Sequence, residues 1–179
     1  MNTRLLDILD FWFSQENCSK WFVKNRDFDQ EILLKFYSLY MQAKARQISC
    51  DEYSSKEILA MIILFDQFPR NMFRGQAEAF ATDDKALILA KNGIKNFLDR
   101  ELPNEQRSFF YMPFMHSENL QDQVLSLKLF SFDSKAQEFA NAHFEIIKRF
   151  GRFPHRNAAL KRESTPQELE FLNQPGSSF

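Results

Sequence analysis

The stretch that decides the fold is residues 54–69, with the sequence SSKEILAMIILFDQFP. Ser54 and Glu57 have the spacing of a capping box, in which each side chain binds the other residue's backbone N–H at the start of a helix. Eight apolar residues follow at positions 58–65, and Pro69 then removes a backbone donor. This pattern predicts a central, buried helix that begins after Ser54 and stops at Pro69.

Apolar residues recur at spacings of three and four along the rest of the chain, which is typical of amphipathic helices. No useful stretch alternates with a period of two, so we expect an all-α fold of about eight helices. We expect N-caps at Thr82 or Asp83, at Ser117 and at Asp133, and a capping box of Thr165 with Glu168. We also expect a left-handed C-cap at Gly93 and a helix over residues 104–112 that ends before Pro113. Short connections between these helices predict antiparallel helical hairpins.

The length of 179 residues fits a single domain, which we place at residues 1–172, followed by a tail at residues 173–179. The chain has 4 glycines and neither common glycine-rich phosphate loop, which argues against P-loop and dinucleotide-binding folds. Its net charge of −1 argues against nucleic acid and anionic membranes as partners. The longest apolar run has eight residues and the N-terminus lacks a signal-peptide core, so we expect a cytoplasmic protein.

The cysteines and histidines show no spacing that would hold a metal ion. Cys18 and Cys50 lie far apart without a C-x-x-C motif, and we interpret both as reduced packing residues. His143 lies on the apolar face of a predicted helix, which favours a hydrogen-bonded core histidine over a ligand. We therefore expect neither a metal nor a cofactor.

The first polar motif follows the central helix and contains Asp66, Arg70, Asn71 and Arg74. Proline at position 69 disfavours helical backbone at the residue before it, so we expect the chain to leave the helix there. Arg70 could pair with Asp66 and neutralise the carbonyl end of the helix, which would be a purely structural role. It could equally bind an anionic ligand.

The second motif is MPFMHSEN at residues 112–119. With Ser117 as the N-cap, His116 would precede a helix and Glu118 would lie in its first turn. A histidine beside a carboxylate can act as a general base.

The third motif is a basic turn at residues 146–162, which has six basic residues and no acid. It contains Arg152, His155, Arg156 and Asn157 beside aromatic residues, glycine and proline. Arginines placed in this way suit two-point contacts with phosphate or carboxylate, although they could also bind acids of the same chain.

Antiparallel helices would bring the three motifs to one end of the molecule. The convergence predicts one polar site. Its candidate catalytic residues are His116, Glu118, His155 and Asp66, and its candidate ligand-binding residues are Arg70, Asn71, Arg74, Arg152, Arg156 and Asn157.

The sequence resembles the bacterial family named domain of unknown function 924. The resemblance rests on LDFWF (9–13), ILFDQFPRNMFRG (63–75), AFATDDKAL (79–87), FFYMPFMHSE (109–118), H-x-x-I-x-x-RFGRFPHRN (143–157) and REST-x-x-E (162–168), in that order. It implies an all-helical fold similar to tetratricopeptide-like superhelices, and it implies no reaction. The family usually has glycine where this chain has Lys161, so we expect an altered backbone there and an altered orientation of Arg162.

Three hypotheses about function remain open. The first is a binding module for an anionic small molecule or peptide, which Arg70, Arg152 and Arg156 would hold. The second is a hydrolase or transferase with His116 or His155 as general base, oriented by Glu118 or Asp66. The third is a scaffold whose motifs only join helix ends. Because the sequence has no strong nucleophile motif, we rank the binding module first and the enzyme second. The sequence does not indicate the oligomeric state.

Overall fold

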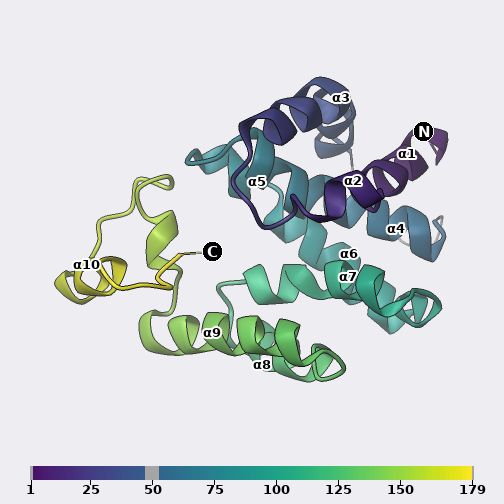
Figure 1. Ribbon diagram of the computed structural model, residues 1–179. Helices are drawn as coiled ribbons and strands as arrows, with labels where there is room; N and C mark the ends of the chain where they lie inside the picture. Colours follow the sequence, from purple (N-terminus) through teal and green to yellow (C-terminus); the bar gives the residue numbers. More distant parts are fainter. Residues whose placement is uncertain (1, 47–52, 179) are drawn as a thin grey trace. The chain divides into compact units, whose positions relative to one another are not determined.

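The computed structural model describes residues 2–46 and 53–178, and all of the regular structure in these residues is helical. The prediction of an all-α fold is therefore confirmed. Figure 1 shows the helices α1 (Asn2–Trp12), α2 (Gln15–Cys18), α3 (Arg26–Lys44), α4 (Ser55–Ile62), α5 (Phe68–Met72), α6 (Asp83–Lys95), α7 (Asn104–His116), α8 (Leu120–Leu129), α9 (Ser134–Phe150) and α10 (Pro166–Leu172). None of the helices within the described ranges is long and apolar enough to cross a bilayer.

The described residues form two compact units. The first unit comprises those of Met1–Arg74 and Glu78–Pro113, and the second comprises those of Gly75–Ala77 and Phe114–Phe179. The single domain expected over residues 1–172 would require the two units to associate, and it stays a prediction. The tetratricopeptide-like superhelix also stays a prediction. In the tail, the Ser177 hydroxyl donates to the Leu172 carbonyl at 3.1 Å, while Phe179 lies outside the described residues.

The central helix of the first unit is the one that the sequence predicts. Ser54 and Glu57 form the capping box, and every residue from 58 to 65 is fully buried. Helix α4 packs against α1 and α6. Beside it, Trp12 of α1 contacts the rings of Phe28, Phe68 and Phe109, with centroids 5.6 to 5.9 Å apart. This aromatic cluster accounts for part of the high phenylalanine content, because each ring removes a large apolar area from water.

The helical segment that begins with α4 does not stop at Pro69, contrary to expectation. It continues as a π-helical turn, Ile63–Gln67, and then as α5, with Phe68 in the right-handed helical region and Pro69 in the first turn of α5. Because proline has no N–H, the Phe65 carbonyl four residues earlier needs another donor. The Thr82 hydroxyl supplies it at 2.7 Å. A residue distant in sequence therefore allows the proline inside a continuous helical segment.

Packing changes two further expectations about α6. Thr82 is the N-cap residue of α6, as expected, but its side chain caps no backbone N–H because its hydroxyl is bound to Phe65 instead. Gly93 is not a left-handed C-cap, because α6 continues to Lys95. A β-carbon at residue 93 would lie 3.1 Å from Cε1 of Phe110 and closer still to its Cζ. Glycine is present there because the phenylalanine ring approaches the helix backbone.

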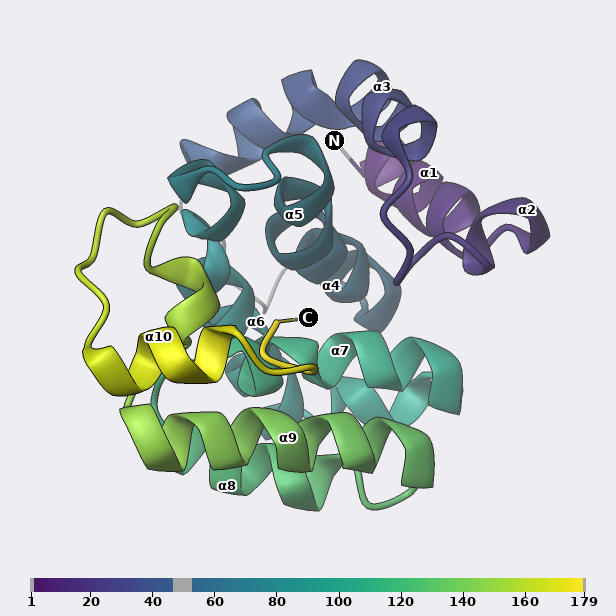
Figure 2. The ribbon, with the colours of Figure 1, turned by 60° about the vertical axis from the view of Figure 1, so that its left-hand side comes forward.

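In the second unit, α8 and α9 lie side by side, as both ribbon views show (Figures 1 and 2). The N-cap of α8 is Asn119, whose side chain accepts hydrogen bonds from the N–H groups of Gln121 and Asp122. The expected cap at Ser117 is therefore wrong, and Glu118 precedes the helix rather than lying in its first turn.

Helix α7 also differs from expectation, because it runs through Pro113 and includes His116. The amide of Gln123 donates to the carbonyls of Met115 and Ser117, each at 2.7 Å, and so satisfies the end of α7.

Two other predicted helix starts in this unit are confirmed. Asp133 caps α9, and Thr165 forms a capping box with Glu168 at the start of α10. Helix α9 ends at Gly151, which has φ of 69° and was not predicted as a helix end. The core of the unit contains Ile146, Ile147 and Phe153.

Candidate functional site

Arg70 of the first motif is held by two carboxylates of the first unit. Its two terminal nitrogens donate to both oxygens of Asp83 at 2.8 and 2.9 Å, and Nη1 lies 3.2 Å from Oδ1 of the fully buried Asp66. Nη1 also donates to the Asp66 carbonyl at 2.5 Å. Burial lowers the pKa of Arg70, but the two carboxylates outweigh it and raise the pKa above its ordinary value. The expected pair between Arg70 and Asp66 is confirmed, and Asp83 adds a second partner.

Asn71 and Arg74 bind one carboxylate, that of Asp29 on α3. The Asn71 amide donates to Oδ1 at 2.8 Å, while Nε and Nη2 of Arg74 donate to the two oxygens at 2.6 and 2.9 Å. Asp29 and Asp83 were not among the predicted site residues. Local sequence offered Asp83 only as a possible helix cap and gave no signal for Asp29, which lies more than 40 residues away from both partners.

Glu118 of the second motif is bound by the basic turn within the second unit. Arg162 donates to its oxygens at 2.7 and 3.0 Å, and the Phe153 N–H donates to Oε1 at 2.8 Å. Burial raises the pKa of Glu118, but the bonds from Arg162 and Phe153 outweigh it and hold the pKa below its ordinary value. Glu118 is thus a stable anion that fixes the turn.

Arg162 is oriented by this turn as well. Its Nε donates to the Asn157 side-chain oxygen at 3.0 Å, and the Asn157 amide donates to Ser164 at 3.0 Å. Lys161 has φ of 55°, in the left-handed region that favours glycine. The backbone at Lys161 therefore has the conformation that a glycine favours, contrary to our expectation of an altered loop.

Arg152 pairs with Glu168 at the start of α10. Nε and Nη2 donate to the two carboxylate oxygens at 2.6 and 2.8 Å, and Nη2 also donates to the Glu163 carbonyl at 2.8 Å. The hydrogen bond from Arg152 lowers the pKa of Glu168 to about 2, although burial acts in the opposite direction. The same carboxylate also accepts the Thr165 N–H of the capping box at 2.7 Å.

The three histidines of the chain form a connected group in the second unit, in which two of them contact Phe153 and the third contacts His143. The rings of His116 and His143 lie 6.0 Å apart, and those of His143 and His155 lie 5.5 and 5.6 Å from the Phe153 ring. The Arg156 guanidinium lies 4.5 Å from the centre of the same ring and donates to the His116 carbonyl at 3.0 Å. We call His116, His143, His155 and Arg156 the histidine cluster.

Within this cluster His143 has the character that its position on α9 predicts. It is buried, and its Nδ1–H donates to the Phe139 carbonyl at 2.8 Å. Burial, followed by repulsion from His116, lowers its pKa to about 3, and Arg156 and His155 act in the same direction. His143 is therefore neutral in ordinary buffers, and its neighbours create a positive potential around it.

The structure thus assigns the predicted site residues to two clusters in separate units. Asp66, Arg70, Asn71 and Arg74 lie in the first unit, and His116, Glu118, Arg152, His155, Arg156 and Asn157 lie in the second. Convergence of the two clusters at one end stays a prediction. No group of three or more histidine, cysteine, aspartate or glutamate side chains among residues 2–46 and 53–178 could hold a metal ion. Cys18 is a free thiol, and Cys50 lies outside these ranges.

These features define an all-helical protein in which arginines make two-point contacts with carboxylates at the helix ends. The chain belongs to a family of bacterial proteins of unknown function, DUF924, whose sequence model matches residues 8–176. It is similar to the solved structure of a protein of unknown function from Agrobacterium tumefaciens, with 36% sequence identity and a TM-score of 0.90, over 96% of this chain and 98% of that one. No curated protein matches the chain.

Proposed function

We propose that the second unit binds a small anionic ligand, one that carries a phosphate or a carboxylate, at the histidine cluster. The observation that carries this proposal is the grouping of four side chains: His143, His155 and Arg156 contact the Phe153 ring, and His116 contacts His143. Imidazole and guanidinium N–H groups are the donors that recognise such anions. Burial is the main cause of the low pKa of His143, and repulsion from His116, Arg156 and His155 lowers it further. An anion bound at the cluster would relieve this repulsion.

The contacts of the other arginines favour Arg156 as the residue that meets the ligand. Arg70, Arg74 and Arg152 each bind both oxygens of a carboxylate of their own unit. Releasing any of them would leave a carboxylate without its two hydrogen bonds, which is costly. Arg156 belongs to the histidine cluster, where its guanidinium donates to the His116 carbonyl and lies over the Phe153 ring. We therefore assign the ligand contact to Arg156 by its place in this cluster.

The contacts of Glu118 favour binding over catalysis. Both of its oxygens accept hydrogen bonds from Arg162, and one also accepts the Phe153 N–H. A carboxylate engaged in this way is a poor partner for a catalytic histidine, since reorienting it would break three bonds. We therefore propose no reaction for the cluster.

The test compares two arginines of the same turn. Thermal melts of the wild type, Arg156→Gln and Arg152→Gln are measured with and without tens of millimolar inorganic phosphate, at constant ionic strength. A ligand that binds only the folded state raises its melting temperature. We expect phosphate to stabilise the wild type and Arg152→Gln but not Arg156→Gln. An equal response of all three proteins would contradict the proposal.

A second measurement does not depend on the stability of the variants. The chain has only three histidines, so their ring signals are readily resolved by NMR. We expect the signals of His116 and His155 to shift saturably with phosphate and to stay in place with sodium chloride of equal ionic strength. Identical shifts with both salts would show screening rather than binding, and would contradict the proposal.

A further inference from the structure

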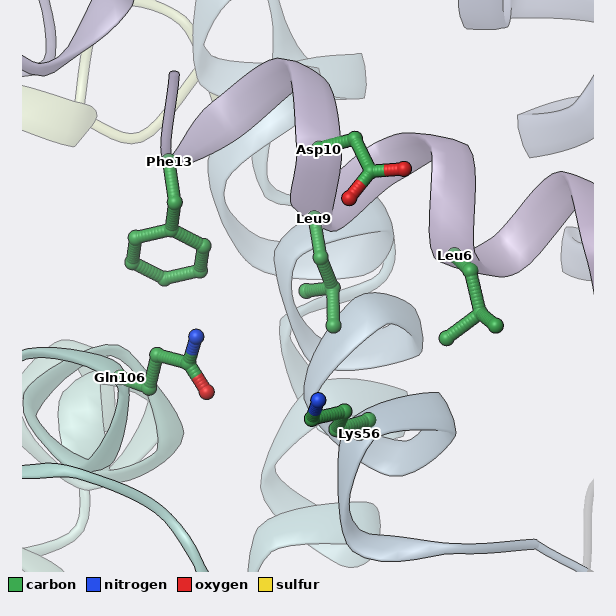
Figure 3. Close-up of a pocket in the computed structure, with 6 residues that line it drawn as sticks. All are labelled: Leu6, Leu9, Asp10, Phe13, Lys56 and Gln106. Atoms are coloured by element: carbon green, nitrogen blue, oxygen red, sulfur yellow. The ribbon is translucent and has the colours of Figure 1, made fainter. Parts of the chain in front are cut away.

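The first unit has a cavity of about 410 Å³ that none of the three polar motifs includes. Figure 3 shows the side chains that line it: Leu6, Leu9, Asp10 and Phe13 come from α1 and the residue after it, Lys56 from α4, and Gln106 from α7. Leu9 points from α1 toward Lys56, and Gln106 lies opposite Phe13 (Figure 3). The volume is within the range of small-molecule sites, roughly 300 to 1,000 Å³.

One polar atom of this cavity, the side-chain oxygen of Gln106, is unusual because it is buried without a hydrogen-bond partner among the described residues. Buried polar atoms nearly always have a partner, so an orphaned amide oxygen at a cavity wall indicates a missing donor. Asp10 and Lys56 line the same cavity, and neither forms an ion pair within residues 2–46 and 53–178.

The remaining lining residues provide an apolar wall. Leu6, which is 42% exposed, and Leu9 lie one turn apart on α1, and Phe13 continues the row. The Phe13 ring lies 5.5 Å from the rings of Trp21 and Phe109, so it is backed by the aromatic cluster. The cavity thus combines an apolar wall, one negative charge, one positive charge and one buried hydrogen-bond acceptor.

We propose that this cavity binds a small zwitterion with an apolar side chain, of the size of an apolar dipeptide. The ligand's ammonium group would donate to Asp10, and its peptide N–H would donate to the Gln106 oxygen. Its carboxylate would accept from Lys56, and its side chain would cover Leu9 and Phe13. Each part of the ligand then meets the group of opposite charge or similar polarity, which is the arrangement that gives a small site its specificity.

The test uses L-leucyl-L-leucine as the probe, with its N-acetylated, amidated and doubly capped forms. Trp21 contacts the cavity wall through Phe13, so intrinsic tryptophan fluorescence of the full chain reports binding. We expect a saturable change with the free dipeptide and binding at least tenfold weaker for the doubly capped form, a difference of about 1.4 kcal/mol. No saturable change at up to about 10 mM, or equal binding of the free and capped peptides, would overturn the proposal.

Charge-specific variants show which group each residue recognises. We expect Asp10→Asn to weaken binding of the free dipeptide about tenfold while leaving binding of the N-acetylated form unchanged. We expect Lys56→Gln to weaken binding of the free dipeptide about tenfold while leaving binding of the amidated form unchanged. Asp7→Asn is the matched control, because Asp7 is an exposed acid on the same helix that does not line the cavity. All three residues lie at the surface, so the variants should fold normally. An equal loss in Asp7→Asn and Asp10→Asn would also overturn the proposal.

Discussion

Arg162 binds Glu118 across the second unit through two hydrogen bonds, Nη1 to Oε2 at 2.7 Å and Nη2 to Oε1 at 3.0 Å. The same guanidinium donates to the Asn157 side chain at 3.0 Å and to the Phe153 carbonyl at 3.2 Å. It therefore fastens residues 153–162 of the basic turn to Glu118, which directly precedes the N-cap residue of α8. Arg156, which contacts the Phe153 ring, is held in place by this fastening.

Replacing Arg162 with Gln should lower the free energy of unfolding by about 2 kcal/mol, because hydrogen bonds to charged groups contribute roughly 1.5 to 3 kcal/mol and this pair is partly exposed. Arg162→Lys should retain less than half of the stability that Arg162→Gln loses, since an ammonium cannot make the two-point contact. Urea denaturation measures both. Lys128→Gln, an exposed charge of the same unit, is the control, and a loss no larger than the control's would contradict a role for Arg162 in fastening the turn.

Replacing Lys161 with Gly should stabilise the protein. Lys161 has φ of 55°, and left-handed backbone costs a residue with a β-carbon roughly 1 to 2 kcal/mol. The greater freedom of glycine in the unfolded chain offsets part of this gain, so we expect a net increase of about 1 kcal/mol or less. Lys161→Ala removes the same charge but keeps the β-carbon, and should show no gain. A higher melting temperature for Lys161→Ala than for Lys161→Gly would contradict this account.

Acid should destabilise the protein through Glu168. Its pKa is about 2 in the folded protein, against an ordinary value of 4.5. Between these two pH values the unfolded chain binds a proton that the folded protein does not, so stability falls as the pH falls from 4.5 toward 2. Glu168→Gln keeps the capping box, because glutamine also suits that position, but it removes this titration.

Urea denaturation at several pH values checks the prediction. The stability of Glu168→Gln should depend less steeply on pH in this window than that of the wild type. Glu170→Gln, an exposed acid in the same helix, should keep the wild-type slope. Parallel curves for the wild type and Glu168→Gln would show that the pair with Arg152 contributes little to folding.

Replacing Gly93 with Ala should destabilise the first unit, although alanine is the better helix former. The new β-carbon would overlap the fully buried ring of Phe110. Overpacking typically costs about 1 to 3 kcal/mol, and the gain in helix propensity returns up to about 1 kcal/mol. We expect a net loss of about 1 to 2 kcal/mol in the free energy of unfolding.

Two further variants isolate the contact between residue 93 and the ring. Asn92→Ala, at an exposed neighbouring position, should be neutral or slightly stabilising. Gly93→Ala should lower the free energy of unfolding less in a Phe110→Leu background than in the wild type, because the smaller side chain leaves room for the new β-carbon. Strictly additive effects of the two changes would contradict direct overlap.

The sequence by itself determined those features that depend on residues within one helical turn. The capping boxes of Ser54 with Glu57 and of Thr165 with Glu168, and the Asp133 cap of α9, are all where the sequence predicts them. The burial of residues 58–65 followed from their unbroken apolar character. Such features are predictable because both partners of each contact lie a few residues apart, so the spacing alone specifies the geometry.

Only the tertiary structure decided which distant groups meet. Sequence alone predicts a helix end at Pro69, but the Thr82 hydroxyl supplies the hydrogen bond that proline cannot make, and the helical segment continues. Sequence alone also predicts a helix end at Gly93, where the glycine instead makes room for the Phe110 ring. Likewise, the sequence of the basic turn indicates that its arginines need anionic partners. It does not indicate that Glu168 binds Arg152 and that Glu118 binds Arg162. The physical reason is that a charge or a missing donor sets a requirement which many groups could meet. Packing of the helices alone brings one of them within hydrogen-bonding distance.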